Sequence, residues 1–171
     1  EIKSLMEKLK EEKDSIGGTI ETIVVGLPLG VGEPWFDSLE GVISKAMFAL
    51  GGVKGIEFGS GFNFVSSRGS EVQTCALPIY KIIFKTNHNG GINGGISNGN
   101  PIVFNLAIKP TPSIGLKQHS INLENKEDVE IEIKGRHDPA IVRRIPIVVE
   151  SILAIVLGDE LSKLYGKDYL K

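Results

Sequence analysis

The sequence has few features that could crosslink it or anchor it to a membrane or a nucleic acid. Cys75 is the only cysteine among 171 residues, so no internal disulfide can form, and a lone thiol fits a reducing compartment. The longest apolar run, residues 145–157, is shorter than the roughly 20 residues of a membrane span and is interrupted by Pro146. A formal net charge of −2 favours neither general nucleic-acid binding nor a membrane surface. We therefore expect a cytoplasmic location, with no nucleic-acid and no membrane partner.

The composition and the first residues indicate part of a globular protein. Hydrophobic residues make up 41% and charged residues 23% of the chain, which suffices for one buried core, so we expect residues 1–171 to form a single domain. The chain begins with Glu rather than Met. Ile2, Leu5 and Leu9 already recur at helical spacing, which predicts an amphipathic helix over residues 2–12. We interpret the sequence as a fragment.

The remaining patterns predict mixed α and β structure with helices packed on a sheet. Predicted strands cover residues 19–26, 53–58, 80–84, 101–108 and 129–133, and further helices cover residues 36–50 and 138–165. Asp138 and Pro139 fit the cap and first position of the last helix, whose dipole would keep the Asp138 carboxyl ionised. Pro146 marks a point where this helix is kinked or restarts.

One segment, residues 69–79, does not fit the rest of the chain. Its sequence, GSEVQTCALPI, has neither a helix nor a strand pattern and no recognisable turn signature. It resembles a translated sequencing-adapter read-through. We interpret it as a non-native insert or loop, in which case Cys75 carries no biological information.

A glycine-rich segment gives the strongest functional signal. Residues 86–99 read TNHNGGINGGISNG. Glycine pairs let a backbone approach a ligand closely, and successive N–H groups can form an anion-binding concavity. The spacing fits neither the Walker nor the Rossmann glycine pattern. A flexible glycine-rich loop is the alternative interpretation.

Two shorter motifs carry further polar groups. Residues 109–113, KPTPS, combine hydrogen-bond donors with two stiffening prolines, although they could also be a rigid exit from an edge strand. In residues 135–139, GRHDP, Arg136 can grip a phosphate or carboxylate, and Asp138 can accept a proton or merely cap the helix. His137 is expected to be structural. The three histidines lack metal-ligand spacing, and no serine lies on a nucleophile elbow.

Six collinear motifs resemble those of chorismate synthases. They are DSIGG at 14–18, GLPLGVGEPWFD at 26–37, VKGIEFG at 53–59, TNHNGGINGGISNGNP at 86–101, KPTPS at 109–113 and GRHDP at 135–139. The resemblance covers nearly all of the chain except residues 69–79. It implies an α+β fold, the β-α-β sandwich of that family, of which this chain would supply the C-terminal part.

The resemblance also implies an activity. Chorismate synthases are lyases of the shikimate pathway, and hence of aromatic amino acid biosynthesis. They eliminate phosphate from 5-enolpyruvylshikimate 3-phosphate in an anti-1,4 sense to give chorismate. They require reduced FMN (FMNH2), which bifunctional members regenerate with NADPH, and they are typically homotetramers. We expect the same flavin, substrate and assembly for the full-length parent.

The resemblance implies cofactor-binding, substrate-binding and catalytic roles for particular residues. The expected FMN contacts are Gly51, Gly52, Gly94, Lys109, Pro110, Thr111, Pro112, Ser113 and Arg136. Arg136 is also expected at the substrate phosphate. Asp138 matches the catalytic aspartate that accepts a proton from flavin N5.

The chain departs from the family in ways that limit its function. The two catalytic histidines and the substrate-binding arginines of the family's N-terminal half have no counterpart here, and Ala140 replaces the usual cysteine. We therefore predict that the isolated chain is inactive. The alternatives are a non-catalytic FMN- or phosphate-binding fragment, and a half that folds only with its partner half.

Overall fold

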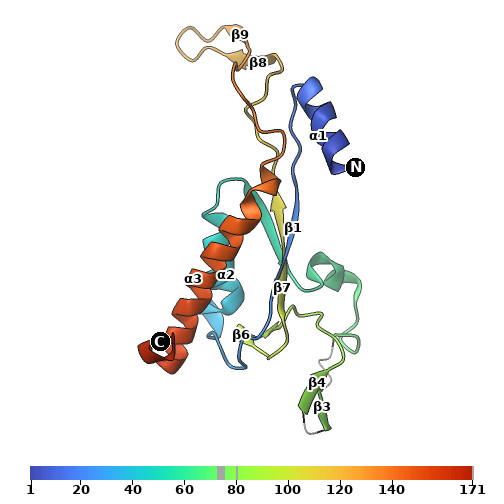
Figure 1. Cartoon of the computed structure of the whole chain (residues 1–171), viewed down its shortest axis with the longest axis vertical. Helices are drawn as coiled ribbons and strands as arrows, with labels where there is room; N and C mark the ends of the chain where they lie inside the picture. The colour runs from blue at the N-terminus through green and yellow to red at the C-terminus, as the bar shows by residue number, and fades with distance from the viewer. Residues whose placement is uncertain (73–75, 80, 171) are drawn as a thin grey trace.

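The centre of the molecule is an antiparallel sheet. The computed structural model describes residues 1–72, 76–79 and 81–170, so Cys75 and Tyr80 lie outside the described residues. Within these ranges β1 (Gly18–Val24), β7 (Ile102–Ile108) and β2 (Val53–Phe58) pair in the order β1-β7-β2 (Figure 1). Alternate residues of β7, from Ile102 to Ile108, are buried, as expected for a strand covered on one face.

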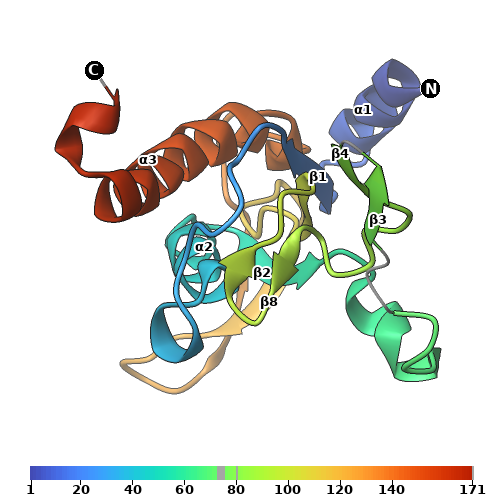
Figure 2. The same ribbon diagram turned by 90° about the horizontal axis from the view of Figure 1, so that it is seen from below.

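Two helices cover that buried face. The helices α2 (Leu39–Phe48) and α3 (Ile145–Tyr165) lie side by side on the same side of the sheet (Figure 2). The core between the layers includes Ile20, Ile43, Met47, Phe104, Leu106, Val149, Leu153 and Leu157. The side chain of Ser38 begins α2 by accepting a hydrogen bond from the N–H of Gly41 at 3.0 Å. The predicted helix over residues 36–50 is therefore shorter, because a 3₁₀ turn, η1 (Trp35–Asp37), precedes it.

Smaller elements extend from the two ends of the sheet. The helix α1 (Ile2–Glu11) and the hairpin of β8 (Gln118–Ile121) with β9 (Asp128–Ile131) project beyond one end (Figure 1). The opposite end carries β5 (Ile92–Asn93), β6 (Ile96–Ser97) and the hairpin of β3 (Ala76–Ile79) with β4 (Lys81–Phe84). The remaining 3₁₀ helices are η2 (Gly61–Ser66), η3 (Ile141–Arg143) and η4 (Lys167–Leu170). Within the described part of the chain, no helix has both the length and the apolarity needed to cross a membrane.

The prediction that residues 69–79 contain no strand was wrong at their end. Ala76–Ile79 form β3, which pairs antiparallel with Lys81–Phe84 from Ala76 opposite Phe84 to Ile79 opposite Lys81. Pro78 is compatible with this arrangement because a proline is tolerated on an edge strand, where its missing N–H is not needed. The interpretation of the segment as a non-native insert stays a prediction.

The predicted helix start at Asp138 was also wrong. The chain first forms the short η3 (Ile141–Arg143), and α3 then begins at Ile145 with Pro146 in its first turn. A continuous helix would place the Pro146 ring against the carbonyl of Val142, four residues earlier. The restart at Pro146 is thus confirmed, whereas Asp138 neither caps a helix nor lies in the field of a helix start.

Candidate functional site

Three predicted site segments meet at one end of the sheet, where β1 and β2 begin and β7 ends. We call this region the sheet junction; it comprises residues 51–52, 109–113 and 136–138. The N–H of Lys109 donates to the Gly52 carbonyl at 2.9 Å. The Ser113 hydroxyl lies 3.3 Å from His137 Nδ1. Residues separated by up to 87 positions in the sequence therefore share one site.

The turn before β1 ties the junction together. The Ser15 hydroxyl donates to the Thr111 carbonyl at 2.6 Å, and the N–H of Ile16 donates to the Pro139 carbonyl at 2.8 Å. These two bonds join the segment containing Thr111 to the segment containing Pro139. The motif at residues 14–18 therefore acts as a brace behind the site, a role that its sequence did not indicate.

Asp138 is held in place but is not enclosed. One carboxylate oxygen accepts from the N–H of Ala140 at 3.2 Å, and the other lies 3.1 Å from Nε of Arg144. The Asp138 side chain is 24% exposed, so a ligand could still reach it. Arg144 orients the carboxylate from outside, since its own side chain is 80% exposed.

His137 is occupied by structural bonds, as expected. Its Nε2 lies 2.9 Å from the Ile133 carbonyl, and a carbonyl can only accept, so Nε2 carries the proton of the neutral ring. Its Nδ1 is then free to accept from Ser113. With both ring nitrogens engaged, His137 fixes the junction rather than offering a base.

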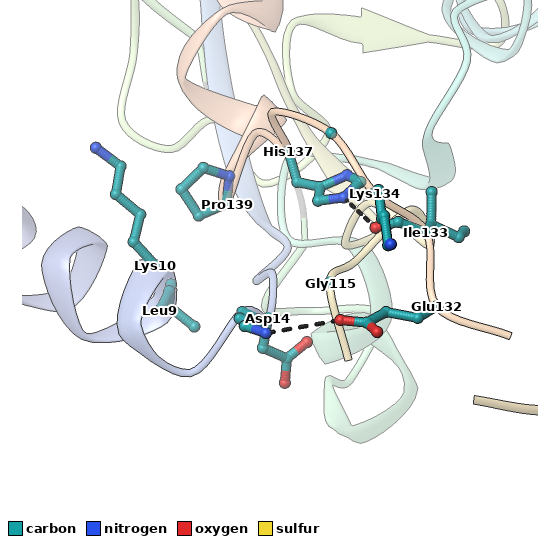
Figure 3. A pocket seen from close by; sticks show the side chains of 11 residues that line it. Leu9, Lys10, Asp14, Gly115, Glu132, Ile133, Lys134, His137 and Pro139 are labelled. Carbon is teal, nitrogen blue, oxygen red and sulfur yellow. Dashed lines mark hydrogen bonds and ion pairs between the residues drawn. The ribbon is translucent and has the colours of Figure 1, made fainter. Parts of the chain in front are cut away.

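Two adjoining cavities open beside these residues. The larger, of about 730 Å³, is lined by Met6, Lys10, Arg136, His137, Asp138, Pro139, Ala140, Arg143 and Arg144. The smaller, of about 330 Å³, lies between α1 and the base of the β8–β9 hairpin, with Leu9 and Lys10 on one side and His137 and Ile133 on the other (Figure 3). Sequence reasoning missed Met6 and Lys10, because nothing in the sequence places α1 against a segment more than 120 residues away.

The junction also retains polar groups that lack partners. The Thr111 hydroxyl is buried without a hydrogen bond. The side chains of Lys109 and Arg136 make no hydrogen bond or ion pair to another residue that the structure describes. Gly52 has a φ of +100°, a conformation that favours glycine, and a Cβ there would lie 3.2 Å from Cδ1 of Ile141. A phosphate-bearing, hydrogen-bonding cofactor such as FMN fits this set, because it would satisfy the hydroxyl and the cations together.

The glycine-rich segment lies at the opposite end of the sheet. β7 separates Gly94, which precedes it, from Lys109, which follows it, and its seven residues span about 20 Å at roughly 3.3 Å each (Figure 1). The structure therefore does not bring Gly94 together with residues 109–113 and Arg136. The remaining expected FMN contacts do converge.

Gly90, Gly91 and Gly95 of this segment serve backbone packing, because a Cβ on any of them would clash with the backbone of another residue. We call residues 26–34 and 86–99 together the glycine clasp. Ser97, 2% exposed, donates to the Pro28 carbonyl at 2.6 Å and accepts from the N–H of Val31 at 2.9 Å. The Gly95 carbonyl accepts from the N–H of Leu39 at 2.8 Å, and a Cβ on Gly95 would lie 2.8 Å from that of Ser38.

Gly94 differs from its neighbour Gly95 in its surroundings. Its φ is +59°, it is exposed, and a Cβ there would meet no atom within 4 Å. The expectation of an anion-binding concavity does not suit Gly95, whose surroundings are filled by other backbone. Gly94 alone of these two keeps open space around it, so any ligand contact of this turn would be made there.

Metal chemistry finds no support in the described ranges. No group of three or more His, Cys, Asp or Glu residues within them could hold a metal ion. The chemistry available at the junction is therefore that of cations, hydroxyls and one carboxylate.

Comparisons with known proteins agree with the motifs. Residues 1–161 match the family model described as chorismate synthase. A chorismate synthase of Korarchaeum cryptofilum is 48% identical over 159 residues, which cover 92% of this chain and 44% of the relative. One of Methanocaldococcus jannaschii is 48% identical over 168 residues, covering 95% and 44%.

A solved structure agrees as well. A crystal structure of chorismate synthase superposes with a TM-score of 0.77 at 29% identity, over 99% of this chain and 44% of that one. The expected α+β fold is thereby confirmed. The chain spans less than half the length of the relatives and of the solved structure that it matches.

Proposed function

Because the chain belongs to the chorismate synthase family, we propose that, once completed by the portion it lacks relative to its relatives, it converts 5-enolpyruvylshikimate 3-phosphate to chorismate with loss of phosphate. The observation that carries this proposal is the convergence of residues 51–52, 109–113 and 136–138 on one junction. Three motifs scattered in the sequence supply one site with donors, cations and a carboxylate.

The chain's own residues have distinct tasks in this proposal. Lys109, Thr111 and Arg136 bind the flavin and its phosphate through groups that otherwise lack partners. Reduced FMN, which these residues would hold, would supply an electron-rich ring to the elimination of phosphate. Asp138 accepts and holds a proton on its carboxylate, and Arg144 keeps that carboxylate oriented.

Two surface properties support the need for the missing portion. The accessible surface is 11872 Å², whereas a compact monomer of 18.5 kDa exposes about 8,200 Å². The helix α3 carries apolar residues on its outer side as well as toward the core, since Ile147, Val148 and Ile155 are exposed on it. A helix that is apolar all round is normally buried all round.

The finer properties of the family belong to the same proposal. They are FMN as the specific flavin, NADPH for its reduction in bifunctional members, a homotetrameric assembly and a cytoplasmic location. A second candidate, a non-catalytic FMN- or phosphate-binding fragment, is favoured by the presence of a binding junction in a chain spanning 44% of its relatives.

The proposal is tested by completing the enzyme. The 171-residue chain is assayed anaerobically with reduced FMN and 5-enolpyruvylshikimate 3-phosphate, alone and after co-expression with the portion of a relative that it does not match. We expect no chorismate from the chain alone and measurable chorismate from the pair. A pair that copurifies and binds FMN without making chorismate would support the binding fragment, and activity of the chain alone would refute the predicted inactivity.

A further inference from the structure

The larger cavity carries more positive charge than the proposed flavin contacts require. Four cations line it, Lys10, Arg136, Arg143 and Arg144, against one carboxylate, Asp138, so its formal charge is +3 with His137 neutral. The whole chain has a net charge of −2. The positive charge is therefore concentrated at one place, which attracts anions to it.

Only one of these cations is neutralised. Arg144 pairs with Asp138 at 3.1 Å. In the described residues, no hydrogen bond or ion pair reaches the side chain of Lys10, Arg136 or Arg143. Three unpaired cations around one cavity repel each other. A multiply charged anion between them would replace this repulsion by electrostatic attraction.

The position of Lys10 is fixed by the fold. Leu9, next to it on α1, is buried at 8% exposure. The N–H of Gly115 donates to the Lys13 carbonyl at 3.1 Å, and Lys13 also lies 3.7 Å from Glu132. These contacts hold the end of α1 against the base of the β8–β9 hairpin (Figure 3). Lys10 also lines the larger cavity, together with the segment after Gly135.

The geometry points to an anion subsite in which Lys10 and Arg143 join Arg136 to bind a phosphomonoester dianion beside Asp138. Two guanidinium forks and an ammonium suit the oxygens of a dianionic phosphate. A cavity of about 730 Å³ has room for the organic part of the ester as well. The inference rests on the proposed function, since that reaction brings two phosphomonoesters, substrate and flavin, to this junction.

The test compares two double variants of equal charge. Lys10→Gln with Arg143→Gln removes the proposed subsite, and Lys3→Gln with Arg68→Gln removes the same charge from exposed positions that do not line the cavity. Each chain is titrated with inorganic phosphate, shikimate 3-phosphate, FMN and riboflavin, followed by amide shifts in NMR spectra. Retained spectral dispersion establishes that each variant is folded.

We expect the cavity variant to bind at least one phosphomonoester, shikimate 3-phosphate or FMN, about tenfold more weakly, and the control variant to change less than about twofold. The ester that loses affinity identifies the source of the phosphate. Equal losses of affinity in both variants would overturn the inference. So would the absence of phosphate binding by the unaltered chain at about 10 mM inorganic phosphate, because weaker binding would not define a site. If the double cavity variant is unfolded, the single variant Arg143→Gln replaces it, because Arg143 is exposed. The same loss of phosphomonoester affinity is then expected of that variant.

The outcomes separate this inference from the proposed function. Phosphate-dependent binding that the cavity variant loses, without any flavin binding, keeps the subsite and counts against the flavin-dependent reaction. FMN and riboflavin binding that both variants retain equally keeps the flavin proposal and removes Lys10 and Arg143 from it.

Discussion

The two ends of the sheet are both built from glycine- and proline-rich loops, and each holds a buried polar atom without a partner, Asn87 Oδ1 in the clasp and the Thr111 hydroxyl at the junction, but their surroundings differ. In the glycine clasp, Ser97 and Gly95 are bonded to the neighbouring loop and to the start of α2. At the sheet junction, the side chains of Lys109 and Arg136 lack partners among the described residues, and Arg136 lines a cavity. Unpaired cations beside a cavity therefore locate a binding site better than glycine content does, because glycine also serves close backbone packing.

The largest expected effect breaks the clasp itself. Gly95→Ala should lower the free energy of unfolding by about 3 kcal/mol or more, since it adds a left-handed φ of +91° to a clash with Ser38. Gly94→Ala, with φ +59° and open space, should cost about 1 kcal/mol. Urea unfolding of the two variants measures the contrast. Equal costs would mean that Gly95 is not packed as described.

At the junction the expected loss is one of activity rather than of stability. In the completed enzyme, Asp138→Asn should lower the rate of chorismate formation about 100-fold, as removal of a general base does. Its unfolding free energy should change by less than about 1 kcal/mol, because the ion pair with Arg144 is largely exposed. Asp128→Asn, on the exposed hairpin, serves as the control and should retain its rate. An unchanged rate in the Asp138 variant would remove that residue from the mechanism.

Two serine-to-alanine substitutions compare the stability and the flavin binding of the two ends of the sheet. Ser97→Ala should cost about 2 kcal/mol, because it leaves a buried carbonyl and a buried N–H without their partner. Ser15→Ala loses one bond, to Thr111, and should cost about 1 kcal/mol. Only the Ser15 variant should also weaken flavin binding, as measured by fluorescence quenching. Weaker flavin binding in the Ser97 variant would assign the clasp a role in the site.

The smallest effect concerns the ion pairs of Lys163 near the C-terminal end of α3. The hydrogen bond to Glu160, and then that to Asp159, raises the pKa of Lys163 above its ordinary value. Its stabilisation is therefore complete below the ordinary lysine pKa of about 10.4 and is lost as the pH rises through the higher folded value. Lys163 is 51% exposed, so solvent screening keeps the contribution small.

Substitution isolates this contribution from other alkaline titrations. The stability difference between the unaltered chain and Lys163→Met should shrink above about pH 10.4, as followed by urea midpoints. A difference that stays constant to the alkaline limit of folding would show that the pair with the buried Glu160 does not stabilise the folded state.

Local patterns predicted the parts of the fold that local physics decides. The strand Val53–Phe58 has the predicted bounds, and α1 differs by one residue at its end. The start of α3 was missed because the capping preference of Asp138 and the steric conflict at Pro146 compete, and the latter prevails. The strand Gln118–Ile121 was missed because its residues are polar and exposed.

The candidate site was also predicted only in part, because some of its residues are placed by tertiary contacts. Resemblance supplied residues 51–52, 109–113, Arg136 and Asp138, which the junction brings together. It could not supply Lys10, whose place depends on tertiary contacts of α1. Nor could the glycine pattern show that Gly95 is enclosed and Gly94 is not, since the two residues are of one type and adjacent in the sequence.

The order of elements along the chain sets when the core can close during synthesis. The inner face of the sheet, with Phe104 and Leu106, is covered by Val149, Leu153 and Leu157 of α3, which follows every strand of that sheet. At 5–20 residues per second, roughly ten seconds pass between translation of β1 and completion of α3. The strands of this sheet can therefore pair before α3 is available to cover them.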